Sequence, residues 1–344
     1  MGEEQKQPGY LAAQKVEIKY TYARFYRRVF ANLTDFIIFA FAFVGLFIGI
    51  RAIVVHTPDY VAHEDALTSI RTESGMYHAA SNGRMMDIVS YLDSEEAAYS
   101  GFAKMDLARE TVTKFIAYIE NKSGGEAAKQ VQNDYDQYRL NPKFTYESAT
   151  FFIKNAEGEI IHNPDCNANA ATYFAKAYAP FIDEHCQGYL ITLVPEYLDL
   201  IHYESAVLFA GELLPAYLLA PILTYYVPML CFRRGRMTLG KAMYRIGVVD
   251  KNLLVPSWKR TLARFGIFYV AEMLLAPFTF AIPFLVSVSL MAFSKSHQGL
   301  PDYFLGLYEV DVTNDKIYFS REEILLTGAA ESKEPVNFKP TYED

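Results

Sequence analysis

The sequence predicts an α-helical integral membrane protein that carries a mainly α-helical domain outside the membrane. Three observations support this fold class: apolar residues gather in three blocks, a long acidic stretch separates the first two, and basic residues gather beside the blocks. The chain has 344 residues, of which 51% are hydrophobic and 21% charged, so its average composition hides this unevenness. The blocks argue against a simple soluble protein, and 26 Tyr with 25 Phe argue against a mainly disordered chain.

The first apolar block runs from about Val29 to Ile50, and Asp35 is the one charged residue inside it. A hydrocarbon core of roughly 30 Å requires about 20 apolar residues at ~1.5 Å each. We therefore expect a membrane-spanning helix over residues 29–51, preceded by a cytoplasmic segment over 1–28.

The second apolar block predicts another membrane-spanning helix over residues 206–232, with Glu212 near its start. Proline lacks the N–H that a helix interior uses, so we expect kinks at three positions. These are Pro215, Pro221 and Pro228.

The third block, residues 262–294, is longer than one crossing requires and shorter than two full crossings with a turn. Pro277 and Pro283 fall in its middle. It predicts either one long bent helix or a hairpin of two short helices, so the chain has three spans, or three plus a short hairpin partner.

The charge distribution predicts the orientation of the spans. Residues 1–28 hold six Lys and Arg against three acids, and residues 233–264 hold nine against one, whereas residues 52–205 hold eleven against 23. Because Lys and Arg concentrate on the cytoplasmic side, we expect a multi-pass cell-membrane protein with a cytoplasmic N-terminus, a basic cytoplasmic loop at 233–261 and an extracytoplasmic domain at 52–205. The net charge of −8 is then a sum over two sides of a bilayer and does not indicate a nucleic-acid partner.

The stretch between the first two spans reads as one compact α-rich domain of about 140 residues, long enough to hold its own core. Residues 102–122 carry apolar residues at helical spacing, and Ser123-Gly124-Gly125 ends this pattern. Residues 149–162 predict a small β-hairpin with Gly158 in its turn. At the other end of the chain, residues 295–344 form a C-terminal segment whose last stretch is expected to be disordered.

Two cysteines, Cys166 and Cys186, lie in the predicted extracytoplasmic domain, where an oxidising compartment allows a disulfide. The alternatives are two unpaired thiols or a metal site with His162 and His185. The metal site is disfavoured because adjacent residues such as His185 and Cys186 point about 100° apart on a helix. We expect no metal and no cofactor.

Three carboxylates fall inside the predicted spans: Asp35, Glu212 and Glu272. A buried carboxylate is expensive in lipid, so each should face a bundle interior or a water-filled cavity, with Arg28 or Arg264 as a partner. Asp35 lies about 10 Å above Arg28 and Glu272 about 12 Å above Arg264, so the two acids would meet at one depth. Acids staggered across a bilayer predict an ion or proton route, and structural polar clamps between helices are the alternative.

The basic loop contains a short motif, with Gly235, Thr238, Gly240 and Lys241 as its marked positions. It nearly matches a phosphate-binding loop, but Ala242 replaces the hydroxyl residue that would hold Mg²⁺, and a membrane span precedes it in place of a buried strand. We expect this motif to shape a turn just under the membrane.

Four motifs in order resemble the RDD family of membrane proteins. They are Arg27-Arg28-x-x-Ala31-x-x-x-Asp35, Gly235-x-x-Thr238-x-Gly240-Lys241, Ile246 to Asp250 followed by Arg264, and Gly299-Leu300-Pro301-Asp302-x-x-x-Gly306. The resemblance spans residues 20–311 discontinuously, with 52–205 as a large insertion between the first two spans. It implies that Arg28 (or Arg27), Asp35 and Asp302 are the residues for which the family is named.

The same resemblance implies a role in transport, with cation/proton antiport in some members, and places the last Asp on the cytoplasmic side, which favours the hairpin. This chain departs from the family at Pro301, where a His is usual, and at Arg245, where a small residue is frequent.

Two functions are therefore expected. In the first, the protein is an ion- or proton-coupled transporter or a transporter subunit, with Asp35 and Glu272 binding the cation. In the second, it is a receptor or assembly factor whose extracytoplasmic domain binds a partner. No hydrolase motif is present, so we do not expect an enzyme. The expected partners are the lipid bilayer, further copies of the chain or another membrane protein, and an unknown extracytoplasmic ligand.

Overall fold

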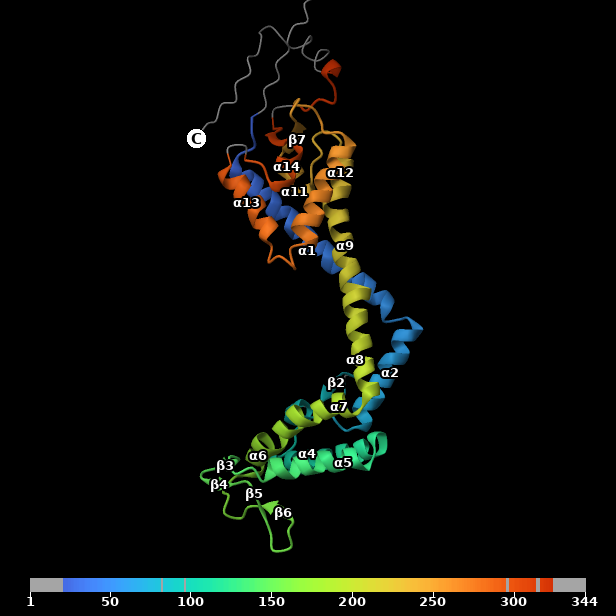
Figure 1. Ribbon diagram of the computed structural model, residues 1–344, viewed down its shortest axis with the longest axis vertical. Helices are drawn as coiled ribbons and strands as arrows, with labels where there is room; N and C mark the ends of the chain where they lie inside the picture. The colour runs from blue at the N-terminus through green and yellow to red at the C-terminus, as the bar shows by residue number, and fades with distance from the viewer. Residues whose placement is uncertain (1–20, 82, 96, 295–296, 314–315, 324–344) are drawn as a thin grey trace, which may run out of the picture. The chain divides into compact units, whose positions relative to one another are not determined.

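The computed structural model describes residues 21–323 except 82, 96, 295–296 and 314–315 (Figure 1). Most of the predicted N-terminal segment and the predicted disordered tail lie outside these residues. The chain divides into two compact units: a terminal unit formed by residues 1–50 and 213–344, and a central unit formed by Arg51–Glu212. Most described residues are helical, and the strands form small antiparallel pairs.

Two helices are long and apolar enough to cross a membrane. The first is α1, Phe25–Val54, with 30 residues, or about 45 Å of rise. The second runs continuously from Pro195 to Cys231 over 37 residues. It starts earlier in the sequence than the apolar block, because polar helical turns precede the apolar ones.

The second long helix is built from α-helical and π-helical segments. They are α8 (Pro195–Ala206), η3 (Val207–Leu213), α9 (Leu214–Pro221), η4 (Ile222–Tyr226) and α10 (Val227–Cys231). Each of its three internal prolines lies at or next to a boundary between these segments. A π-helical turn leaves room for a proline ring that would clash with the preceding turn of a regular helix, so the helix continues through all three.

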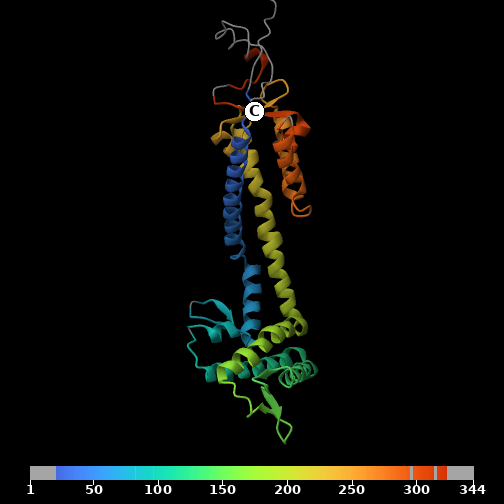
Figure 2. The same cartoon turned by 90° about the vertical axis from the view of Figure 1, so that its left-hand side faces the viewer.

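The third apolar block folds back on itself within the terminal unit (Figure 2). Helix α12 (Trp258–Ile267) continues into η5 (Phe268–Leu274), a turn follows, and α13 (Ile282–Phe293) returns. Phe280 and Ala281 have positive φ angles of 49° and 57° in that turn. The 12 residues of α13 rise only about 18 Å.

The terminal unit also contains a two-stranded sheet. Strand β7 (Ile246–Asp250) pairs antiparallel with β8 (Leu307–Asp311), with Val248 opposite Glu309. The short helices α11 (Leu239–Met243) and α14 (Leu300–Leu305) flank these strands in the sequence. This pairing joins the segment before α12 to the segment after α13, so both ends of the hairpin are held at one sheet.

The central unit is a helical domain with its own core. Its longer helices are α2 (Pro58–Glu73), α4 (Gly101–Ser123), α5 (Gly125–Arg139) and α7 (Gln187–Leu193), and its shorter ones are α3 (Ile88–Asp93), α6 (Ala170–Tyr173), η1 (Phe174–Tyr178) and η2 (Phe181–Cys186). Helix α4 ends before Gly124, whose φ of 90° no other residue adopts without strain, so the predicted helix stop is confirmed. Phe115, Ile119 and Phe181 are fully buried in the core of this unit.

Three strand pairs complete the central unit: β1 (Tyr77–Ala79) with β2 (Met85–Asp87), β3 (Thr145–Tyr146) with β4 (Ala149–Thr150), and β5 (Phe152–Lys154) with β6 (Ile160–His162). The last pair is the β-hairpin predicted from the sequence. Its turn contains Gly158 at a φ of 86°, and the Asn155 N–H donates to the Glu159 carbonyl at 2.9 Å.

The predicted disulfide is wrong. Cys166 and Cys186 are both free and buried in the core of the central unit. Cys166 is hydrogen-bonded to Tyr173, and burial raises the pKa of the Cys186 thiol. A disulfide requires Cα atoms about 4.4–6.8 Å apart, and these two thiols instead pack separately among aromatic side chains.

Candidate functional site: a buried ion-pair network

The two arginines at the start of α1 anchor this helix to the C-terminal part of the terminal unit. The Arg27 side chain donates to the Asp311 carboxylate, to the Tyr244 carbonyl and, at 3.2 Å, to the Thr313 hydroxyl. Arg28 is buried and donates to the Ala23 carbonyl at 2.8 Å and to the His297 carbonyl. Both cations thus bind groups of their own chain at the level where α1 begins.

Asp35 is buried against the turn motif of residues 235–241. Its carboxylate accepts hydrogen bonds from the Thr238 hydroxyl and, at 2.6 Å, from the Gly240 backbone N–H. Thr238 also caps α11, because its oxygen accepts from the Lys241 N–H at 3.4 Å. The structure therefore brings together an acid of the apolar helix α1 and a loop motif that are about 200 residues apart in the chain.

Only glycine fits at position 240. A Cβ atom there would lie 2.2 Å from the Ala31 carbonyl oxygen and 2.9 Å from an Asp35 oxygen. Ala31 is fully buried at this contact. The backbones of α11 and α1 therefore touch directly, and this close approach places the Gly240 N–H within hydrogen-bonding distance of Asp35.

Next to this contact, two cations and two carboxylates form a connected set of ion pairs. Arg264 on α12 binds both oxygens of Asp302, at 2.5 and 2.8 Å, and one oxygen of Glu309 at 3.2 Å. Lys241 donates to the same Glu309 oxygen. All four side chains are at most 7% exposed. Burial opposes the ionisation of Glu309, but the charges of Lys241 and Arg264 outweigh it and lower the pKa of the carboxyl.

Glu272 forms no ion pair with a cation among the described residues. It lies in η5, is 8% exposed, and its Oε1 has no hydrogen-bond partner among the residues that the structure describes. Its hydrogen-bonding neighbour is the Ser287 hydroxyl on α13. The same hydroxyl oxygen accepts from the Leu300 N–H at 2.9 Å, which links the hairpin to α14.

The charges of this network do not balance when every group is ionised. Within the described part of the terminal unit it contains three buried cations, Arg28, Lys241 and Arg264, and four buried carboxyl groups, Asp35, Glu272, Asp302 and Glu309. Because an uncompensated buried charge is expensive, the arrangement favours one bound proton or one bound monovalent cation. Asp302 and Glu309 are held in ion pairs. The hydrogen-bonding neighbour of Glu272 is instead an uncharged hydroxyl, that of Ser287.

Glu212 does not belong to this network. It is fully buried in η3, in the central unit, and accepts from the Arg51 side chain at 3.1 and 3.3 Å. The sequence analysis missed Arg51 as its partner, although an arginine that ends an apolar block was a signal. That Glu212 shares an ion or proton route with Asp35 and Glu272 stays a prediction.

The sequence analysis also missed Glu309 and Ser287. Glu309 lies between Tyr308 and Val310 in the strand Leu307–Asp311, and an acid between apolar strand residues is the signal that could have marked it. The Gly240 N–H and the Lys241 ammonium already bind carboxylates of this chain, so these two groups do not act as those of a phosphate-binding loop do.

Comparison with known proteins finds one similar family, over part of the chain. The RDD family model matches residues 187–306, which include the turn motif, Arg264, Glu272 and Asp302. No curated protein and no solved structure matches the chain. Helix α1 lies outside the matched range, yet its Asp35 binds two residues inside it. Residues 187–306 are therefore similar to the RDD family, in agreement with the resemblance found in the sequence.

Proposed function

We propose that this protein is a multi-pass membrane protein whose buried ion-pair network binds and releases a proton or a monovalent cation, as a transporter or a transporter subunit. The observation that carries the proposal is Glu272, which is buried and has one oxygen without a hydrogen-bond partner among the described residues. The buried carboxyl groups of the network also outnumber its buried cations by one. Ionisable groups inside membrane segments commonly mark proton or ion pathways.

Two further features support the membrane placement. The two long apolar helices have the length that a bilayer requires. Nine Lys and Arg against one acid in residues 233–264 favour a cytoplasmic position for that segment, and the pairing of β7 with β8 brings the segment after α13 to the same side. On this placement the α12–α13 hairpin enters the bilayer and returns, because α13 is too short to cross it.

The test is ion flux in vesicles that contain the purified full-length protein. We expect a pH gradient to drive cation movement through the wild type and not through Glu272→Gln, which keeps the hydrogen bond to Ser287 but does not titrate. Glu196→Gln is the matched control, because it removes an exposed carboxylate on α8. Equal flux in Glu272→Gln and the wild type would refute the proposal, as would the absence of flux in the wild type.

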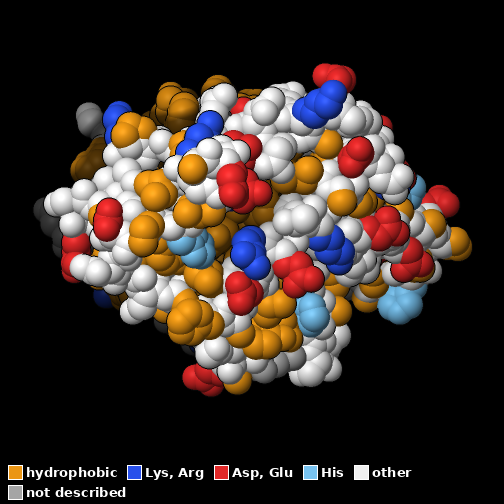
Figure 3. All heavy atoms as spheres, turned by 90° about the horizontal axis from the view of Figure 1, so that it is seen from below, with side chains coloured by type: hydrophobic (Ala, Val, Ile, Leu, Met, Phe, Trp, Pro, Cys, Tyr) orange, Lys and Arg blue, Asp and Glu red, His pale blue; other side chains and the backbone are white. Residues whose placement is uncertain are grey.

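A second function, as a receptor or assembly factor, is favoured by the central unit. Its core includes side chains from most of its helices, and an ion path needs no folded domain of this size. Its surface carries exposed apolar side chains such as Phe102, at 71% exposure, and Ile161, at 40%. On the face seen in Figure 3, apolar side chains lie at the surface between acidic and basic ones.

Crosslinking from the surface of the central unit tests this second function. Photo-crosslinkers placed at Phe102 and at the exposed Glu126 of α5 compare an apolar site with a charged one. A single stoichiometric product that depends on position 102, either a second copy of the chain or another membrane protein, would support a binding role. The same products from both positions, in no fixed stoichiometry, would count against it.

A further inference from the structure

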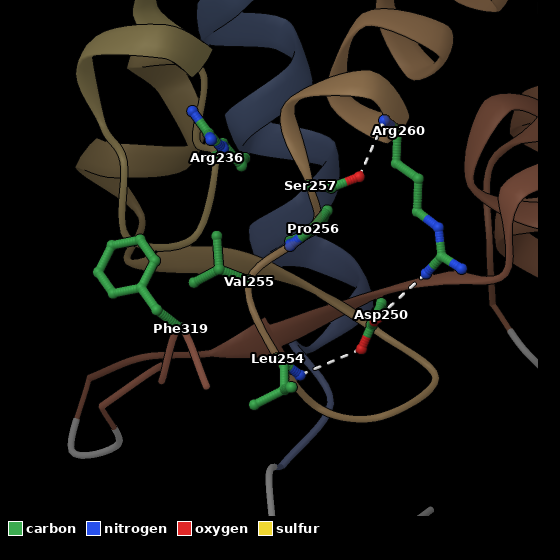
Figure 4. Close-up of a pocket in the computed structure, with 8 residues that line it drawn as sticks. All are labelled: Arg236, Asp250, Leu254, Val255, Pro256, Ser257, Arg260 and Phe319. Carbon is green, nitrogen blue, oxygen red and sulfur yellow. Dashed lines mark hydrogen bonds and ion pairs between the residues drawn. The ribbon is translucent and has the colours of Figure 1, made fainter. Parts of the chain in front are cut away.

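The terminal unit contains an open cleft away from the ion-pair network, with a volume of about 490 Å³. It lies between the end of β7, the loop that leads into α12, and Phe319 (Figure 4). One part of its wall is apolar, formed by Leu254, Val255, Pro256 and Phe319. The other part is polar and includes Arg236, Ser257 and Arg260.

Arg236 is held at this cleft by its backbone. It has a positive φ of 45°, and it follows Gly235, whose φ is 87° and whose carbonyl accepts from the Val248 N–H of β7 at 2.8 Å. A Cβ at position 235 would lie 3.2 Å from the Gly247 Cα, so the turn rests directly on the strand. The guanidinium has one long hydrogen bond, 3.5 Å to the Met229 carbonyl, and its buried Nε has no partner among the described residues.

The opposite side of the cleft is already neutralised. Arg260 donates to Asp250 at 3.0 Å, and that carboxylate also accepts the backbone N–H of Asn252 at 2.8 Å and of Leu254 at 3.2 Å. Figure 4 shows the Arg260–Asp250 pair on one side of Pro256 and Arg236 on the other. An anion in the cleft would therefore be held at the Arg236 side, away from the carboxylate.

Ser257 begins α12, a helix of ten residues, and its hydroxyl oxygen accepts from the Arg260 N–H at 3.4 Å. The first N–H groups of a helix carry partial positive charge and favour anions. The cleft thus combines one cation that lacks a strong partner with a helix N-terminus.

The surroundings favour a lipid over a dissolved anion. Trp258 and Phe319 are 57% and 47% exposed beside the cleft, and exposed Trp is typical of the membrane interface. The second long apolar helix ends at Cys231, a few residues before Arg236, so on the proposed membrane placement the cleft lies at the level of the headgroups. Arg233 is exposed in the same turn and adds to the positive charge there, whereas Arg234 is paired with Glu323 at 3.0 Å.

From these features we propose that the cleft binds the phosphate headgroup of an anionic phospholipid, with the phosphate at Arg236 and the glycerol and upper acyl chain against the apolar wall. This site is separate from the ion-pair network, because none of the residues that line it takes part in that network.

The sequence supplies its own reporter, since Trp258 is the single tryptophan of the chain. The full-length protein is reconstituted in zwitterionic vesicles, and the quenching of its fluorescence by acyl-chain-brominated phosphatidylglycerol is compared with quenching by brominated phosphatidylcholine. We expect the anionic lipid to be preferred at Trp258. Arg236→Gln should lower that preference about fivefold, the effect of one cation at a lipid headgroup.

Arg233→Gln is the matched control, because it removes the same charge from the same turn but does not line the cleft. We expect it to change the preference much less than Arg236→Gln does. An equal loss in both variants would mean diffuse attraction to the surface and would overturn the proposal, as would equal quenching by the two lipids. Inorganic phosphate at millimolar concentration, added to the detergent-solubilised protein, tests the other source: saturable phosphate binding that lipid does not compete for would also overturn it.

Discussion

The direct contact between α11 and α1 predicts a large effect for the smallest change, Gly240→Ala. The new Cβ would lie 2.2 Å from the Ala31 carbonyl oxygen, so the two backbones must separate. Overpacking of this kind costs typically about 1–3 kcal/mol. The separation also breaks or weakens the hydrogen bond from the Gly240 N–H to Asp35, which contributes about 1.5–3 kcal/mol because its acceptor is charged.

Together these effects predict a loss of about 3–5 kcal/mol in the free energy of unfolding. The matched control is Gly266→Ala in α12, where an added Cβ meets nothing within 4 Å. That change should be neutral or stabilising by up to about 1 kcal/mol, since alanine is the better helix former. The measurement is unfolding of the full-length protein in mixed micelles, followed by helical circular dichroism.

If Gly240→Ala unfolds at the same denaturant concentration as Gly266→Ala, then α11 does not lie against α1, and the position of the turn motif is wrong. We expect a lower free energy of unfolding with an unchanged dependence on denaturant concentration. The substitution alters one native contact but not the amount of surface that unfolding exposes.

Three further predictions concern the ion pairs and the cysteines. Arg264→Lys keeps the charge but loses the two-point contact with Asp302, so unfolding in micelles should show a loss of about 1.5–3 kcal/mol, whereas the exposed Arg233→Lys should show almost none. The pKa of Glu309 is lowered from 4.5 to about 2 in the folded state, so its stabilising contribution is complete above pH 4.5 and is lost as the pH falls toward 2. The difference in Tm between the wild type and Glu309→Gln should therefore narrow over that range, and a constant difference would contradict the ion pairing. Alkylation of the unfolded chain without reductant, measured by mass spectrometry, should modify all three cysteines. Two unmodified cysteines would show that a disulfide is present and would contradict the structure.

Local sequence patterns predicted the helices and the hairpin of this protein better than they predicted which side chains contact one another. The apolar blocks around Val29 and Pro221 have the length of a long helix, and α1 and the helix that ends at Cys231 follow from them. The stop at Gly124 and the hairpin around Gly158 also depend on a few adjacent residues, whose backbone preferences are short-range. The length of the third block allowed either one long helix or a hairpin, and the turn at Phe280 makes it a hairpin.

The partners of the buried charges required the tertiary structure. Asp35 was marked by its place in an apolar helix, but nothing local connects it to Thr238, because the pairing depends on how α11 packs against α1. Two cysteines in one predicted extracytoplasmic domain suggested a disulfide, but whether they pair depends on how the core packs, and both are free.

The sequence by itself determined that the chain has long apolar helices, a separate polar domain and acids that need partners, since these properties follow from composition and periodicity along the chain. Only the tertiary structure decided which groups each acid binds, and that Glu272 has an oxygen without a hydrogen-bond partner among the described residues, because those contacts join residues far apart in sequence whose approach is set by backbone packing.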